Sequence, residues 1–180
     1  MLARDSQSRL AGRGLQTFEA EFFTDHLIIR GETWGPDSRL SDHVNSTSAS
    51  IDLRPLSVVR LGDAKTTIST DGTTASLAKR HLLLILPLTE EIRGPGGNSA
   101  WAPVTLHRAW AIVGDYEVAG MVATDQGVND DRIALRQLEQ KRFLAFNAAT
   151  ITGPGGEKRE CRTVIVNGER MEFLALVSDR

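Results

Sequence analysis

The longest apolar run of the sequence, Leu82 to Leu88, spans seven residues and contains Pro87. A transmembrane helix needs about 18 to 20 consecutive apolar residues, so this run is too short to cross a bilayer. Residues 82–86 show no alternation of apolar and polar side chains, which is typical of a strand that is buried on both faces. The run therefore predicts the central strand of a β-rich core.

Further β segments lie on both sides of this run. Residues 18–30 are rich in Phe, Ile and Leu and predict two strands that turn near Asp25. Residues 51–61 alternate around Pro55, which has no backbone N–H and predicts an edge or a bulge. Later strands are expected at 104–113, 116–123, 142–152 and 161–177, with short helices at 39–45 and 131–140. The expected fold class is all-β or β-dominated α+β.

The order of the expected elements occurs twice. We expect a flexible lead at residues 1–16, a strand-strand-helix-strand-strand unit at 17–90, a linker at 91–103 and a second such unit at 104–180. At an offset of 89 residues, Leu27 falls on Tyr116 and Gly31 falls on Gly120. Because a small sheet with one helix cannot cover both of its apolar faces, we expect the two tandem repeats to pack as a sandwich or as paired small barrels.

The dipeptide Asn167-Gly168 is typical of a two-residue hairpin turn, in which both residues have positive φ. It predicts that residues 162–166 pair with residues 170–177.

Charge and cysteine content disfavour several kinds of partner. Lys and Arg total 21 against 23 Asp and Glu, so the formal charge of -2 offers no strongly basic field for phosphates. The single cysteine, Cys161, cannot form an intramolecular disulfide and has no Cys or His at metal-ligand spacing. The first 16 residues lack the apolar stretch of a secretory signal. We expect a cytoplasmic protein with no cofactor, no metal and no membrane insertion.

The segment Arg39-Leu40-Ser41-Asp42-His43-Val44-Asn45 follows a turn that contains Gly and Pro. It resembles the motif R-L-S-D-x-L-N of a bacterial family of small β-rich domains. The resemblance extends over about residues 22–88 and departs from the pattern at Val44, where Leu is usual. It implies a β-rich fold and, because no activity is established for the family, no active site.

The same segment places Ser41, Asp42 and His43 next to one another. Consecutive side chains on a helix point about 100° apart, so these three cannot form a catalytic triad. We expect Ser41, Asp42 and Asn45 to hydrogen-bond the backbone at the helix ends instead. No catalytic, cofactor-binding or metal-binding residue is assigned, and the least favoured hypothesis is an enzyme that uses Asp25, His26 or Asp42.

Trp34 and Trp101 lie in expected turn or linker segments, and exposed tryptophans are common in binding hot spots. With Arg93 they are our candidate partner-binding residues; alternatively, the indoles cover the sheet ends or the interface between the repeats. The leading hypothesis is a noncatalytic adaptor, assembly or regulatory subunit of a larger bacterial complex, which binds another protein or itself. The alternative is a module that binds a small ligand or RNA in a groove between the repeats.

Overall fold

The computed structural model describes residues 15–37, 39–62, 67–68, 73–89 and 103–177. The expected lead at 1–16 and linker at 91–103 lie almost entirely outside these residues. In chain order the elements are β1 (Gln16–Thr24), β2 (Leu27–Gly35), α1 (Leu40–Val44), β3 (Ser50–Arg60), β4 (Thr67–Ile68), β5 (Ala75–Ala78), η1 (Lys79–His81), β6 (Leu82–Pro87), β7 (Val104–Val113), β8 (Tyr116–Asp125), α2 (Asp131–Glu139), β9 (Phe143–Thr152), β10 (Lys158–Asn167), η2 (Gly168–Arg170) and β11 (Met171–Leu176).

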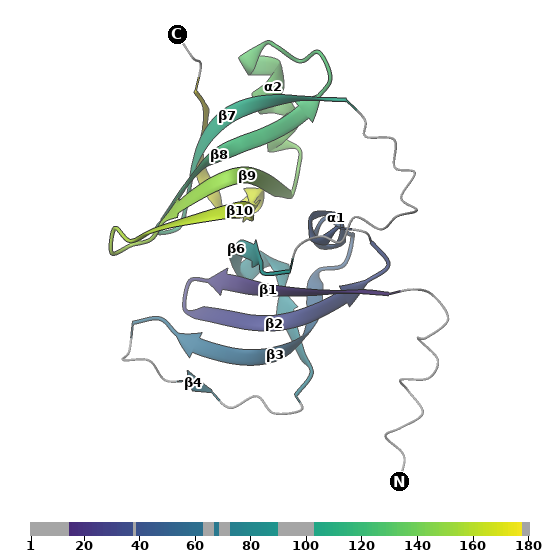
Figure 1. The fold of residues 1–180 in the computed structure, drawn as a ribbon, viewed down its shortest axis with the longest axis vertical. Helices are drawn as coiled ribbons and strands as arrows, with labels where there is room; N and C mark the ends of the chain where they lie inside the picture. Colours follow the sequence, from purple (N-terminus) through teal and green to yellow (C-terminus); the bar gives the residue numbers. More distant parts are fainter. Residues whose placement is uncertain (1–14, 38, 63–66, 69–72, 90–102, 178–180) are drawn as a thin grey trace.

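All of these strands belong to one antiparallel sheet. Hydrogen-bonded neighbours follow the order β11-β7-β8-β9-β10-β6-β1-β2-β3-β4, and β5 pairs with β3. Figure 1 shows the first half of the chain (residues 15–89) below and the second half (residues 103–177) above, with β6 between them. The expected β-dominated fold class is confirmed.

The arrangement of the two halves differs in detail from the expected one. Among the described residues, each half contains more strands than the four expected, six in the first and five in the second, and its last strand, β6 or β11, pairs with its first strand, β1 or β7. The two halves also share one sheet, since Ile165 and Val166 of β10 pair with Ile85 and Leu84 of β6. The tandem repeat, packed as a sandwich or paired barrels, stays a prediction.

Strand β6 is the central strand that the apolar run predicts. Its residues 82–86 are at most 2% exposed. Leu82 and Ile85 pack in the core of the first half, whereas Leu83, Leu84 and Leu86 pack in the core of the second half. One strand therefore contributes to two cores, and neither half completes its core from its own strands alone.

The first hairpin turns at Asp25, as expected. The hydroxyl of Thr24 accepts hydrogen bonds from the backbone N–H of His26 at 3.2 Å and of Leu27 at 2.9 Å. These bonds satisfy two donors that the sheet leaves unpaired at the turn. The turn thus follows from one buried threonine.

A bulge interrupts the pairing of β2 with β3 next to Pro55, at the position where the sequence predicts it. The chains approach so closely there that a Cβ on Gly31 would lie 2.8 Å from the carbonyl oxygen of Arg54. The pairing of β8 with β9 is interrupted in the same way, and a Cβ on Gly120 would lie 2.9 Å from the carbonyl oxygen of Asn147. Both positions therefore require glycine.

The two helices lie close to their predicted ranges. Helix α2 begins after Asp130, whose carboxylate accepts from the N–H groups of Arg132 at 2.9 Å and Ile133 at 3.1 Å. Its buried residues, Ala134 and Leu138, are four apart and share one face.

The predicted hairpin turn at Asn167-Gly168 is wrong. Asn167 has φ of -76, and Gly168 begins the 3-10 turn η2. As a result, β10 pairs with β9 and β6, and β11 pairs with β7. The physical reason is the Asn167 side chain, because its amide donates hydrogen bonds to carbonyl groups of the first half.

Candidate functional site

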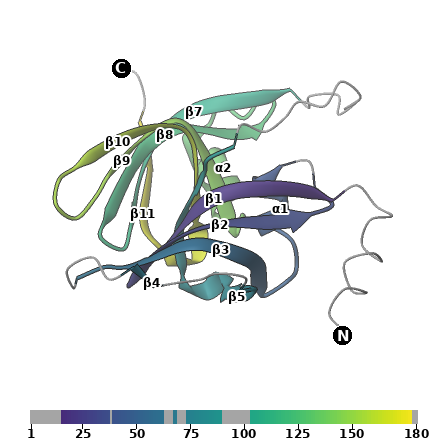
Figure 2. The same ribbon diagram turned by 60° about the horizontal axis from the view of Figure 1, so that its bottom comes forward.

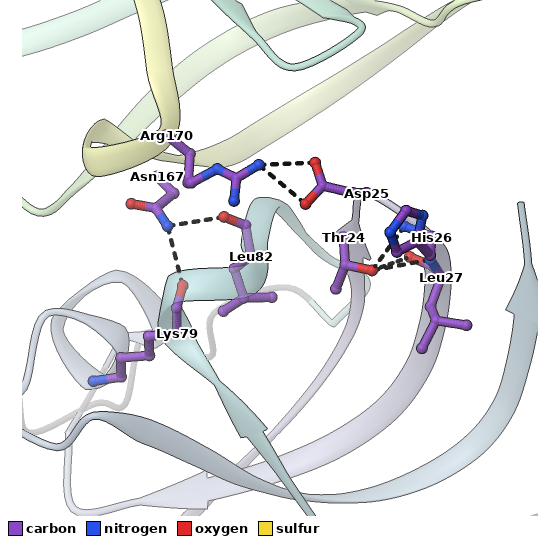
Figure 3. Close-up of polar contacts among 8 residues, drawn as sticks. All are labelled: Thr24, Asp25, His26, Leu27, Lys79, Leu82, Asn167 and Arg170. Carbon is purple, nitrogen blue, oxygen red and sulfur yellow. Dashed lines mark hydrogen bonds and ion pairs between the residues drawn. The ribbon is translucent and has the colours of Figure 1, made fainter.

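The boundary between the two halves is built around the buried amide of Asn167 (Figure 3). This side chain has no exposed surface, and its Nδ2 donates to the carbonyl oxygens of Lys79 at 3.0 Å and Leu82 at 2.8 Å. Its Oδ1 accepts from the backbone N–H of Glu169 at 3.0 Å. Asn167 therefore joins η1 of the first half to η2 of the second.

Two ion pairs also cross this boundary. Nη2 of Arg170 lies 2.8 Å and 3.0 Å from the two carboxylate oxygens of Asp25 (Figure 3). Nη1 of Arg159 lies 2.5 Å from Oε2 of Glu21. Each arginine is thus paired with a carboxylate of the other half, and the two do not converge on an open groove.

The side chain of Lys79 is buried next to these contacts. Its Nζ donates to the carbonyl oxygen of Ser46 at 3.0 Å and to the hydroxyl of Ser46 at 3.1 Å. Burial, and secondarily the positive charge of Arg142, lower the pKa of Lys79. This ammonium group serves the packing of η1 against the loop that follows α1.

The motif segment around α1 has a structural role. Leu40 is buried in the first core, and Arg39 is the N-cap residue but provides no side-chain cap. Nδ2 of Asn45 donates to the carbonyl oxygen of Ser41 at 2.9 Å, which is the expected bond at the helix end. Asp42 is exposed in the first turn of the helix, and no side-chain hydrogen bond caps that end.

Asn45 also reaches across to the second half. Its Oδ1 accepts from the backbone N–H of Phe143 at 3.0 Å, and its Nδ2 donates to the carbonyl oxygen of Phe143 at 3.1 Å. The amide thus binds the first residue of β9 through both a donor and an acceptor. The sequence identified the residue but not this partner.

The candidate partner-binding residues do not form one site among the described residues. Trp34 is half-buried in β2 opposite Thr17, whereas Trp101 and Arg93 lie outside the described residues. The candidates for enzyme chemistry are also dispersed. Asp25 is held in its ion pair, His26 is exposed in the turn, and Asp42 is exposed on α1.

An exposed apolar surface that the sequence analysis did not identify lies on the outer side of β7 and β11. The ring centroids of Trp110 and Phe173 are 5.2 Å apart, and Phe173 is 46% exposed. Val104, Leu106 and Val177 are exposed on the same side, at 52%, 56% and 45%. We call these five residues the edge patch. The alternation along β7 indicates that the strand has two different faces. It does not indicate that both faces carry apolar residues.

A surface pocket of about 510 Å³ lies on the β9–β10 hairpin rather than between the halves. Cys161 lines it and donates from Sγ to the carbonyl oxygen of Ala149 at 3.5 Å. Burial raises the pKa of this thiol, and the charge of Arg159 only partly opposes the effect. The thiol is therefore a weak nucleophile. Within the described part of the chain, no group of three or more His, Cys, Asp or Glu side chains could hold a metal ion.

Comparison of the chain with protein-family models, with curated proteins and with solved structures gave no match. The resemblance of residues 22–88 to a bacterial family therefore stays a prediction. Over the described residues, no helix has the length and apolar character needed to span a membrane.

Proposed function

We propose that the protein is a noncatalytic subunit of a larger cytoplasmic protein assembly, which it joins through the edge patch. The observation that carries this proposal is the exposure of Phe173 and Val177 at one edge of the sheet, beside Trp110. Edge strands offer unpaired backbone N–H and C=O groups, and an apolar edge favours pairing with another chain. Aromatic side chains at the centre of a patch are common hot spots of protein interfaces.

The chemistry of this edge fits a protein partner. An added strand obtains its affinity from main-chain hydrogen bonds and its specificity from alternate side chains. Phe173, Ala175 and Val177 alternate along the outer side of β11 and its C-terminal continuation, with Ala175 opposite Trp110. A β-strand with apolar alternate residues would bury all three.

A substitution at the edge tests this function in the cells from which the protein derives. We expect the tagged wild-type chain to elute within a stoichiometric assembly, well above the 19.7 kDa of one chain. Phe173→Lys should release it, because a lysine ammonium in an apolar interface loses its hydration. Ile133→Lys is the matched control, since Ile133 is 53% exposed on α2 and does not belong to the edge patch. A wild-type chain that elutes alone would contradict the proposal.

A further inference from the structure

The strands of the two halves are paired in one common register. In the first half Phe23 lies opposite both Ile28 of β2 and Leu84 of β6. In the second half each counterpart lies 89 positions further along the chain, and Ile112 lies opposite both Glu117 of β8 and Phe173 of β11. The bulges at Gly31 and Gly120 coincide at the same offset.

The remaining strands correspond as well. Ser50 at the start of β3 pairs with Ala78 at the end of β5, and Phe143 at the start of β9 pairs with Asn167 at the end of β10. The strands β1, β2, β3, β5 and β6 therefore have the counterparts β7, β8, β9, β10 and β11.

The contact that joins the halves uses two of these strand types. Ile165 and Val166 of β10 pair with Ile85 and Leu84 of β6. In this contact the second half uses β10, the fourth of its five described strands, and the first half uses β6, its last described strand. This pairing gives β6 a second neighbour besides β1, and Leu84 of β6 has no exposed surface. The junction is thus an antiparallel pairing of β10 with β6.

The counterparts of these two strands, β5 for β10 and β11 for β6, each have one side without a neighbouring strand in the part of the chain that the structure describes. Among the described residues, β5 pairs with β3 alone and β11 pairs with β7 alone. Figure 2 shows β5 at the lower margin of the first half, beneath β3. Phe173 of β11 corresponds to Leu84 of β6, yet it is 46% exposed. The position that is covered at the junction is therefore uncovered at this edge.

We propose that β11 of one copy of this chain pairs with β5 of a second copy, in the register of the β10–β6 junction. This register places Leu77 opposite Phe173 and Ser76 opposite Leu174. Leu77 is half-buried against the core of the first half, as Val166 is buried in the core of the second. Phe173 then covers the neighbour's first core as Leu84 covers the second core. This inference rests on the proposed function and names its partner.

The proposed contact is directional, because each copy offers β11 on one side and β5 on the other. Such head-to-tail contacts produce closed rings or filaments, in contrast to a two-fold dimer. It also lacks the two hydrogen bonds that the Asn167 amide donates across the internal junction, since the counterpart of Asn167 is Ala78. The contact between copies is therefore weaker than the internal one, and it depends on protein concentration.

The first experiment measures the mass of the purified full chain by sedimentation velocity over a range of concentrations. We expect species that are multiples of 19.7 kDa, and Phe173→Lys should weaken the association by about tenfold or more. Ile133→Lys should leave it unchanged. A purified wild-type chain that stays monomeric overturns the inference. If that chain still joins another protein in cells through Phe173, the proposed function stands while the inference fails.

The second experiment uses small replacements that preserve the fold. The proposed register places Ala75 of one copy opposite Ala175 of another. In a Cys161→Ala background, Ala75→Cys and Ala175→Cys are therefore made in separate chains. We expect the mixture to form a disulfide between the two chains under mild oxidation, and Ala119→Cys, exposed on β8, to form none with Ala75→Cys. Cross-linking of Ala175→Cys with itself but not with Ala75→Cys would show a symmetric edge and overturn the proposal.

Discussion

Asn45 and Phe143 lie 98 positions apart and exchange two hydrogen bonds, as two residues of neighbouring strands do. The side-chain amide of Asn45 takes the place of a backbone peptide group and binds both the N–H and the C=O of Phe143. Together with Asn167, it makes the boundary between the halves a continuous part of the fold.

Replacing Asn167 should destabilise the whole protein. Asn167→Ala leaves the carbonyl groups of Lys79 and Leu82 without their amide partner in a buried site, and we expect the free energy of unfolding to fall by about 2 kcal/mol or more. Urea denaturation measures the change. Asn147→Ala removes an exposed amide of β9 and should cost less than about 0.5 kcal/mol. Equal effects of the two substitutions would contradict the role of Asn167.

The ion pair of Asp25 with Arg170 should contribute little to stability. Both side chains are more than a third exposed, and exposed pairs of this kind contribute about 0.2–1 kcal/mol. A double-mutant cycle with Asp25→Asn and Arg170→Gln measures the coupling energy, which should decrease in high salt because the charges are screened. A coupling energy that is large and insensitive to salt would instead indicate a desolvated pair.

Lys79 should make the stability depend on pH in the alkaline range. The pKa of Lys79 is lowered in the folded protein from its ordinary value of 10.5. As the pH rises toward 10.5, the folded chain therefore releases this proton before the unfolded chain does. Rising pH therefore favours the folded state through this residue. We expect the free energy of unfolding of the wild type to rise relative to that of Lys79→Met as the pH approaches 10.5. A difference that stays constant would contradict a desolvated ammonium group.

The two bulge glycines should respond alike to substitution. A Cβ at either position would lie less than 3 Å from a carbonyl oxygen of the neighbouring strand, so we expect Gly31→Ala and Gly120→Ala each to cost about 1–3 kcal/mol. Thermal unfolding measures both. Ala119→Ser, at an exposed neighbouring position, should have almost no effect. A large cost at one glycine and none at the other would mean that the two bulges are not equivalent.

Local patterns predicted much of the fold. The uninterrupted residues 82–86 indicate a strand buried on both faces, and Pro55 indicates the bulge that is found beside it. The pattern of Asn167-Gly168 was misleading, because turn preference is local, whereas the acceptors that hold Asn167 lie 85 and 88 positions away. Such a long-range partner leaves no mark in the dipeptide.

The edge patch could not be predicted for a related reason. The expected hairpin paired residues 170–177 with residues 162–166 and so gave β11 the wrong neighbour. Pairing with β7 instead puts Phe173 at an edge, beside Trp110. Exposure of an apolar strand residue depends on which strands are its neighbours, and alternation along the strand does not specify them.

Strand β6 has a consequence for the synthesis of the chain on the ribosome. Leu83, Leu84 and Leu86 emerge before the residues of the second half that cover them in the second core. During translation the nascent first half therefore exposes an apolar strand until β10 has been made. In this interval chaperones and neighbouring nascent chains compete for the strand. Slow elongation through residues 104–166 would prolong that risk, and rapid elongation would shorten it.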